Sequence, residues 1–163
     1  MKRLFCIIFC AVILASCSNA SGDDPFSALK GDVVVEVSSV CEGVSCSFEY
    51  ESLQRKLTFI SPSEISGIAL LRQDGKVMIE YDGVTVESSQ YAGRLLLICE
   101  YVFSASSDDI REISAKKGEI TKTVVKTDNC TYVFLADGKP LSVSGNFDGI
   151  DFTFSFDSFR VVK

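Results

Sequence analysis

The chain has 163 residues, of which 47% are hydrophobic, and its 22 acidic and 16 basic residues give a net charge of −6. This length suits one domain with its own core, and the acidic excess argues against nucleic-acid binding, which depends on clustered Lys and Arg. The absence of histidine excludes Ser-His-Asp and Cys-His catalysis and the usual zinc ligand sets.

The first segment of the chain has the features of an export signal. Lys2 and Arg3 precede an apolar run at 4–14, which is too short to cross a bilayer, since crossing takes about 20 apolar residues. The run ends in Leu-Ala-Ser-Cys at Cys17 and resembles the lipobox of bacterial lipoproteins. The resemblance implies a diacylglyceryl group on Cys17 and cleavage after a signal peptide at 1–16. The alternative is an ordinary secretory signal followed by a chance cysteine.

Acyl chains on Cys17 would anchor the protein without a spanning helix, because each buried methylene contributes about 0.8 kcal/mol. We therefore expect a lipid-anchored protein on the extracytoplasmic face of the cell membrane. Residues 17–30 are polar and contain Gly22 and Pro25, which predicts a lipidated tether before a single domain at 31–163. Removal of the two basic residues of the signal makes the net charge −8, so covalent lipid has to carry the attachment.

Alternating apolar and polar residues predict β-strands over much of the domain. Period-two patterning buries one face of each strand and leaves the other in water, which is typical of antiparallel sheets. The alternation is clear at 33–38, 47–51, 77–82 and 151–157. After the helical region, strands are expected at 120–126, 131–135, 141–145 and 150–159, the last of which contains the alternation at 151–157.

Four Asp-Gly pairs lie between these apolar runs. They favour type I′ turns, which need positive φ angles and join paired strands, so the sequence predicts a meander of hairpins. The aspartates are not arranged as a calcium loop, and we expect no metal site. The pairs are Asp74-Gly75, Asp82-Gly83, Asp137-Gly138 and Asp148-Gly149.

One region departs from the strand pattern. Residues 88–104 carry apolar side chains at helical spacing, which predicts a helix buried on much of its circumference. These side chains are Tyr91, Leu95, Ile98 and Val102. A second helix is expected to follow, capped by Ser107, favoured at its start by Asp108 and Asp109, and ended by Gly118.

Four cysteines remain in the exported domain, namely Cys41, Cys46, Cys99 and Cys130. Exported chains form disulfides, and four cysteines allow three pairings. We favour Cys41–Cys46 around a turn at Glu42-Gly43, with Cys99–Cys130 tying the helix to a strand. Buried free thiols are one alternative. A metal site is another, although CxxC spacing and histidine are both lacking.

No residue stands out as a nucleophile, and no phosphate-binding glycine loop occurs. The paired carboxylates Glu49 with Glu51 and Glu80 with Asp82 alternate with aromatic residues, which places them on a solvated strand face. Sugar hydrolysis by such a pair is the alternative interpretation. The sequence therefore predicts neither an enzyme nor a cofactor.

Two runs carry a resemblance to a known family. The run LTFISPSEISGIALLRQDGKVMIEYDGVTVESS joins two strands through Ser-Pro and makes an Asp-Gly hairpin before the apolar helix, and the C-terminus returns with GKPLSVSGNFDGIDFTFSFDSFRV. Over 31–162 this layout resembles small lipoproteins of Gram-positive gut bacteria, distantly similar to the lipoprotein-carrier (Lol-type) superfamily. The resemblance implies an α+β, mostly β fold, an antiparallel sheet curled into an open half-barrel around one or two helices. Carrier members hold acyl chains on the apolar concave face.

Our leading interpretation is a non-catalytic lipoprotein whose concave sheet face binds a lipid or other apolar ligand. Because the chain is itself anchored, it would not be a freely diffusing shuttle. The alternative is that the same residues pack as a closed core, and that the domain is a structural or protein-interaction module of the envelope. The candidates for the apolar face are Phe48, Tyr50, Leu57, Phe59, Ile79, Tyr81, Phe152, Phe154 and Phe156.

Overall fold

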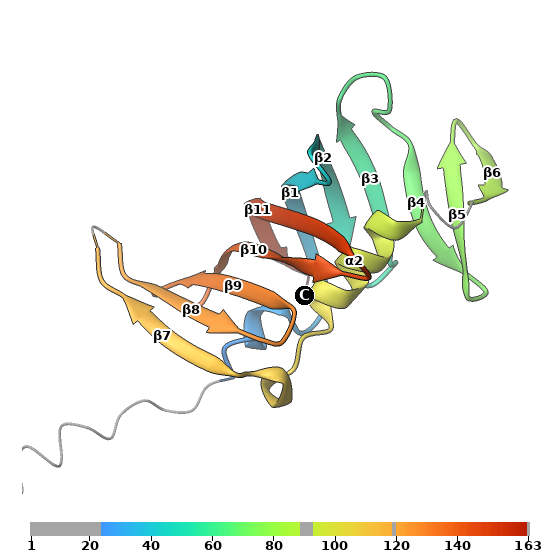
Figure 1. The fold of residues 1–163 in the computed structure, drawn as a ribbon. Helices are drawn as coiled ribbons and strands as arrows, with labels where there is room; N and C mark the ends of the chain where they lie inside the picture. Colours follow the sequence, from blue (N-terminus) through green and yellow to red (C-terminus); the bar gives the residue numbers. More distant parts are fainter. Residues whose placement is uncertain (1–23, 89–92, 119, 163) are drawn as a thin grey trace, which may run out of the picture.

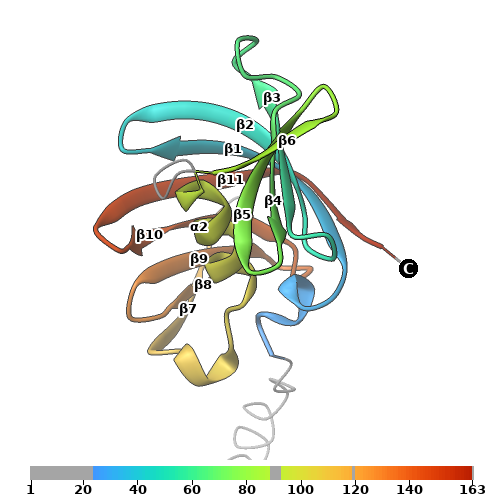
Figure 2. The same ribbon diagram turned by 90° about the vertical axis from the view of Figure 1, so that its right-hand side faces the viewer.

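The computed structural model describes residues 24–88, 93–118 and 120–162 (Figure 1). This part of the chain forms one antiparallel 11-stranded sheet in the order β6-β5-β4-β3-β2-β1-β11-β10-β9-β8-β7. The strands are β1 (Val33–Cys41), β2 (Val44–Glu51), β3 (Lys56–Ser61), β4 (Ala69–Gln73), β5 (Lys76–Tyr81), β6 (Val84–Glu87), β7 (Glu112–Lys116), β8 (Lys122–Lys126), β9 (Cys130–Leu135), β10 (Pro140–Phe147) and β11 (Ile150–Val161). Figure 2 shows the sheet curving around the helix α2 (Arg94–Phe103). The predicted mostly β, open half-barrel fold is confirmed.

The first and last strands pair in the middle of the sheet. β1 runs antiparallel to β11 from Val33 opposite Val161 to Cys41 opposite Phe152. The two meanders β1–β6 and β7–β11 therefore extend outward from this central pair, and β6 and β7 form the two edges. The helix α2 lies between β6 and β7 in the chain, and it sits on the concave side of the sheet.

The predicted Asp-Gly hairpins are largely confirmed. Asp74, Asp82 and Asp148 have φ angles of 51°, 49° and 52°, and each following glycine also has a positive φ. The flanking residues pair directly in each case, as in a two-residue type I′ turn. Glu42-Gly43 makes the same turn between β1 and β2. The pair at Asp137 differs, because only its glycine has a positive φ and Leu135 N donates to Lys139 O across a longer loop.

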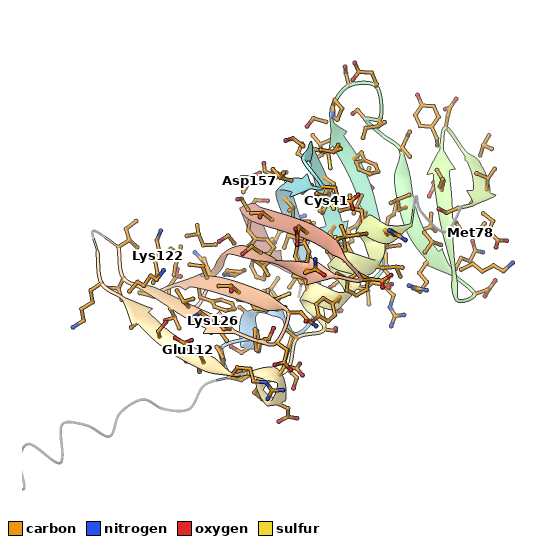
Figure 3. All side chains as sticks on the ribbon, viewed as in Figure 1. Cys41, Met78, Glu112, Lys122, Lys126 and Asp157 are labelled. Carbon is orange, nitrogen blue, oxygen red and sulfur yellow. The ribbon has the colours of Figure 1, made fainter. Side chains whose placement is uncertain are left out.

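The predicted second helix is wrong. The chain makes one 3₁₀ turn, η2 (Ser107–Asp109), capped by Ser106 and not by Ser107. It then enters β7, whose backbone pairs with β8 and whose Glu112 carboxylate accepts from Lys126 Nζ at 2.8 Å (Figure 3). The local capping signals do start a turn, but pairing with β8 supplies the backbone hydrogen bonds that a helix would otherwise supply.

The N-terminal part of the described chain belongs to the core. Phe26 is 0% exposed and Leu29, at the end of the 3₁₀ turn η1 (Ser27–Leu29), is 2% exposed. The Phe26 ring meets the Tyr132 ring edge to face with centroids 4.9 Å apart. The folded domain therefore reaches back to Asp24, where the sequence predicted a tether up to residue 30.

The predicted signal peptide at 1–16, Cys17 and residues 17–23 of the predicted tether lie outside the described residues. None of the helices that the structure describes has the length and apolar character to cross a membrane.

Candidate functional site

The nine predicted apolar-face residues lie mostly in the core beneath α2. The buried ones, with at most 3% of their surface exposed, are Phe48, Tyr50, Leu57, Phe152 and Phe154. Those that are half-buried and packed against the same cluster are Phe59, Ile79 and Phe156. These eight side chains therefore fill much of the concave face, as the closed-core alternative expects of them.

Tyr81 lies apart from the other eight. Its side chain is 57% exposed, and its partner on the edge strand β6, Val84, is 64% exposed. Tyr81 is the last residue of β5, and it does not belong to the core cluster that Ile79 of the same strand packs against.

An open groove lies between the solvent-facing side of α2 and the rim of the sheet. Its volume is about 460 Å³, within the range of small-molecule sites. Aromatic and aliphatic side chains form most of its wall, and a few polar groups lie among them. The lining residues are Tyr50, Ser52, Arg55, Leu97, Glu100, Tyr101, Phe103, Ser104 and Phe147.

The helix and the sheet position the aromatic wall of this groove. Phe103, in the last turn of α2, stacks on Tyr50 with ring centroids 5.0 Å apart and an interplanar angle of 25°. Tyr101 packs against Phe147 at the end of β10, with centroids 5.1 Å apart. Both contacts join α2 to strands, so the wall is fixed by the packing of the helix.

Tyr50 is the one predicted apolar-face residue that also lines the groove. Burial raises the pKa of its phenol well above the usual value, with smaller contributions from Cys99 and Glu100. Its hydroxyl has no hydrogen-bond partner among the described residues. Every fully enclosed side-chain oxygen and nitrogen of those residues has a partner, so the Tyr50 hydroxyl has to reach the open groove.

The positive and negative charges around the groove do not balance. Arg72 on β4 holds Glu100 through two hydrogen bonds, Nε to Oε1 at 2.7 Å and Nη2 to Oε2 at 2.5 Å. This pairing raises the pKa of the Arg72 guanidinium. Arg55, in the turn between β2 and β3, is exposed and has no ion-pair partner among the described residues. The groove therefore carries one surplus positive charge.

A second cavity, of about 150 Å³, lies beside the C-terminal end of α2. Its polar groups are engaged, because Asp109 accepts from Ser106 N at 3.1 Å and Asp128 holds Arg111 through two hydrogen bonds of 2.7 Å. This cavity offers fewer open groups to a ligand than the groove does.

The four cysteines are free thiols in the structure. The register places Cys41 opposite Val44 and Cys46 opposite Ser39, so the favoured Cys41–Cys46 bond would join diagonal neighbours. Diagonal residues lie about 7–8 Å apart, beyond the usual Cα separation of a disulfide, so the backbone would have to move.

The favoured Cys99–Cys130 bond stays a prediction. Burial raises the pKa of both thiols. Cys99 and Cys130 belong to the apolar core cluster, and Cys41 and Cys46 pack against the same cluster.

The paired carboxylates lie away from the groove. Glu49 pairs in register with Glu36 and Thr58, on the sheet face opposite Tyr50, and Glu80 accepts from Lys56 Nζ at 3.2 Å. Among the described residues, no three potential ligating side chains converge to hold a metal ion.

Solved structures with a similar layout include proteins from three bacteria. The Mycobacterium tuberculosis lipoprotein LppX has a TM-score of 0.49 and 11% identity, over 85% of this chain and 93% of that one. A LolA superfamily protein from Nitrosomonas europaea has a TM-score of 0.42 and 10% identity, over 82% and 87% of the two chains. An uncharacterized conserved protein from Thermus thermophilus has a TM-score of 0.46 and 11% identity, over 83% and 82%.

The LolA superfamily is the superfamily that the sequence layout resembled. No protein-family model matches the chain, and no curated protein matches it in sequence. At this distance the likeness concerns the layout of the fold, and the function has to be argued from the residues of the chain.

Sequence reasoning found Tyr50 but missed the rest of the groove. Leu97 and Phe103 could have been found by extending the helical spacing to the outward side of the predicted helix. Arg55 and the Arg72–Glu100 pair gave no signal, because single charges in a sequence do not reveal which of them will meet.

Proposed function

We propose that this protein is a non-catalytic envelope lipoprotein, anchored on the extracytoplasmic face through acyl chains on Cys17, that binds an apolar ligand. The proposed site is the groove over α2 and not the filled concave face below it. The observation that carries the proposal is the aromatic wall around Tyr50, whose hydroxyl is left open within a groove of about 460 Å³. Binding sites for small molecules combine such apolar walls with a few open polar groups.

The anchor is tested by metabolic labelling with an alkyne-tagged fatty acid. We expect label on the wild-type protein and on Cys10→Ser, a matched change within the predicted signal peptide. Cys17→Ser should carry no label, because it removes the proposed acceptor sulfur. Equal labelling of Cys17→Ser would overturn the proposed anchor.

The groove is tested by photo-crosslinking. The mature protein is placed in phosphatidylcholine nanodiscs with a diazirine-bearing hexadecanol, and the labelled peptides are identified by mass spectrometry. We expect label on residues 94–103, and a large loss in Leu97→Asp, which puts a charge into the apolar wall. Val44→Asp, at an exposed hairpin position, is the control and should label as the wild type does. Label spread evenly over the protein would contradict a specific site.

A protein-interaction role is the second candidate, and the edge strand β6 favours it. All four residues of β6 are exposed, and Val84 and Val86 expose 64% and 52% of their surface. Edge strands offer unpaired backbone groups to an extended partner segment. Crosslinking from a photoreactive residue at Thr85 in intact cells, with recovery of one stoichiometric partner, would support this role. Absence of any adduct would count against it.

A further inference from the structure

We propose that the ligand of the groove is a single-chain amphiphile with an acidic head, a carboxylate or a phosphate monoester, held by Arg55 and the Tyr50 hydroxyl. Its apolar chain would lie along the aromatic wall formed with α2. This inference rests on the proposed function, and it adds the chemical class of the ligand and the two residues that select it.

The first argument is the charge of the groove. Glu100 is neutralised by Arg72, so its carboxylate is not free to pair with Arg55. Within residues 24–88, 93–118 and 120–162, Arg55 therefore leaves one uncompensated guanidinium, in a protein whose net charge is −6. A guanidinium without a partner binds carboxylates and phosphates through paired N–H donors, and such charge-assisted hydrogen bonds are among the strong ones. A cationic head would be repelled at this position.

The second argument is the Tyr50 hydroxyl. The Tyr50 residue is only 2% exposed, so its phenol reaches solvent only through the groove. Stacking on Phe103 fixes the ring, and the raised pKa of the phenol keeps its proton in place at neutral pH. Tyr50 is thus a positioned hydrogen-bond donor without an acceptor in the part of the chain that the structure describes. Arg55 and Tyr50 line the same groove, so one acidic head placed between them would meet both donors.

The third argument is the wall that continues from these donors. Leu97, Tyr101 and Phe103 come from α2, and Phe147 comes from the end of β10. Among the lining residues that the structure describes, the ionisable ones are the tyrosines, Arg55 and the neutralised Glu100. An extended apolar chain can therefore follow the acidic head without burying an unpaired charge. A single uncompensated cation matches a head with one or two negative charges, and a polyanion would meet the acidic remainder of the protein.

The experiment uses three diazirine probes with the same C16 chain: the acid, the monophosphate and the neutral alcohol. The mature protein is held in phosphatidylcholine nanodiscs at pH 8, and labelling of the 94–103 peptide is followed against probe concentration. Arg55→Gln removes the cation and Tyr50→Phe removes the hydroxyl while keeping the ring. Arg160→Gln, on an exposed position of β11, is the matched control for loss of one arginine charge.

We expect Arg55→Gln to raise the half-saturating concentration of at least one acidic probe about tenfold, the usual worth of a charged hydrogen bond. Tyr50→Phe should raise it severalfold, and the alcohol should be unaffected by either change. Arg160→Gln should match the wild type with all three probes. Comparison of the acid with the monophosphate identifies which acidic head the site takes.

Two outcomes would overturn the inference, and they differ in what they say of the proposed function. If the alcohol labels the groove as well as the acidic probes, and Arg55→Gln behaves like Arg160→Gln, the acidic head is wrong although the apolar site stands. If none of the three probes labels the 94–103 peptide above the background of the rest of the protein, both the apolar site and its acidic selectivity fail.

Discussion

Arg72 and Glu100 are 28 residues apart in the chain and meet through two hydrogen bonds that join strand β4 to helix α2. Each side chain is 21% exposed, so this ion pair is shielded from water more than the surface pairs of the sheet. The contact fixes the N-terminal half of the sheet to the helix that covers its concave side. It also removes the one carboxylate that lines the groove from competition for Arg55.

Arg72→Gln should destabilise the protein. The change leaves Glu100 charged and partly buried without its partner, which we expect to cost about 1–3 kcal/mol in the free energy of unfolding. The measurement is urea unfolding followed by circular dichroism. Lys76→Gln is the control, because Lys76 and Glu87 are 61% and 57% exposed, and loss of such a surface pair costs about 0–1 kcal/mol. Equal losses in the two variants would show that shielding of the pair is unimportant.

Phe26→Ala tests the start of the folded domain. The side chain is fully buried against Tyr132 and Phe134, so its truncation should cost about 3–5 kcal/mol. Leu53→Ala, at a residue that is 70% exposed, should change stability by less than about 0.5 kcal/mol. The measurement is the thermal unfolding midpoint of both variants and of the wild type. If Phe26→Ala were as stable as the wild type, the result would support the predicted tether that extends to residue 30.

Gly145→Ala tests a close backbone approach between β10 and β9. A Cβ at this position would lie 2.3 Å from Asn129 O and 2.7 Å from Cys130 Sγ, so the strands would have to separate. We expect a loss of about 1–3 kcal/mol, as for overpacking in a core. Gly118→Ala, where the nearest atom is 3.9 Å from the added Cβ, should be neutral. Urea midpoints give both values, and a stable Gly145→Ala protein would contradict the contact.

Alkaline pH should weaken the fold. Burial raises the pKa of the Cys99 thiol and of the Tyr132 phenol above their ordinary values of 9.0 and 10.0. Because the unfolded chain loses these protons first, the stability they contribute is fully present below pH 9 and decreases as the pH rises further.

Urea midpoints under reductant between about pH 8 and pH 10.5 measure this loss. Cys99→Ala should reduce the pH dependence, because it removes one of the buried titrating groups. Val102→Ala also truncates a buried side chain of α2, but it removes no titrating group and should keep the full dependence. A midpoint that stays constant across that whole range in the wild-type protein would refute the prediction.

Local rules predicted most of the sheet. Period-two alternation located strands such as β1 and β11, and three Asp-Gly pairs formed the expected two-residue turns because their geometry is set within four residues. The second helix was mispredicted because Asp109 and Gly118 give local helix signals, whereas pairing of Ile113 with Val125 is a tertiary contact.

The candidate site was less predictable for the same reason. Tyr50 was found from its place on an apolar strand face, which is a local pattern. The Tyr50 hydroxyl faces the groove because of where α2 ends and how Phe103 stacks on the Tyr50 ring. Both are properties of the folded chain and not of a local pattern. The selectivity of Arg55 depends on the capture of Glu100 by Arg72, a residue on another strand of the sheet.

The pairing of β1 with β11 also has a consequence for how the protein is made. The strand that begins at Val33 is synthesised well before its partner β11, which begins at Ile150. Until β11 has been synthesised, the two meanders can form only as separate halves, each with an unpaired edge facing the space where the other will join. A chain that stops before Ile150 would therefore hold two half-sheets without the β1–β11 pairing that joins them, and such a product should be degraded rather than merely weakened.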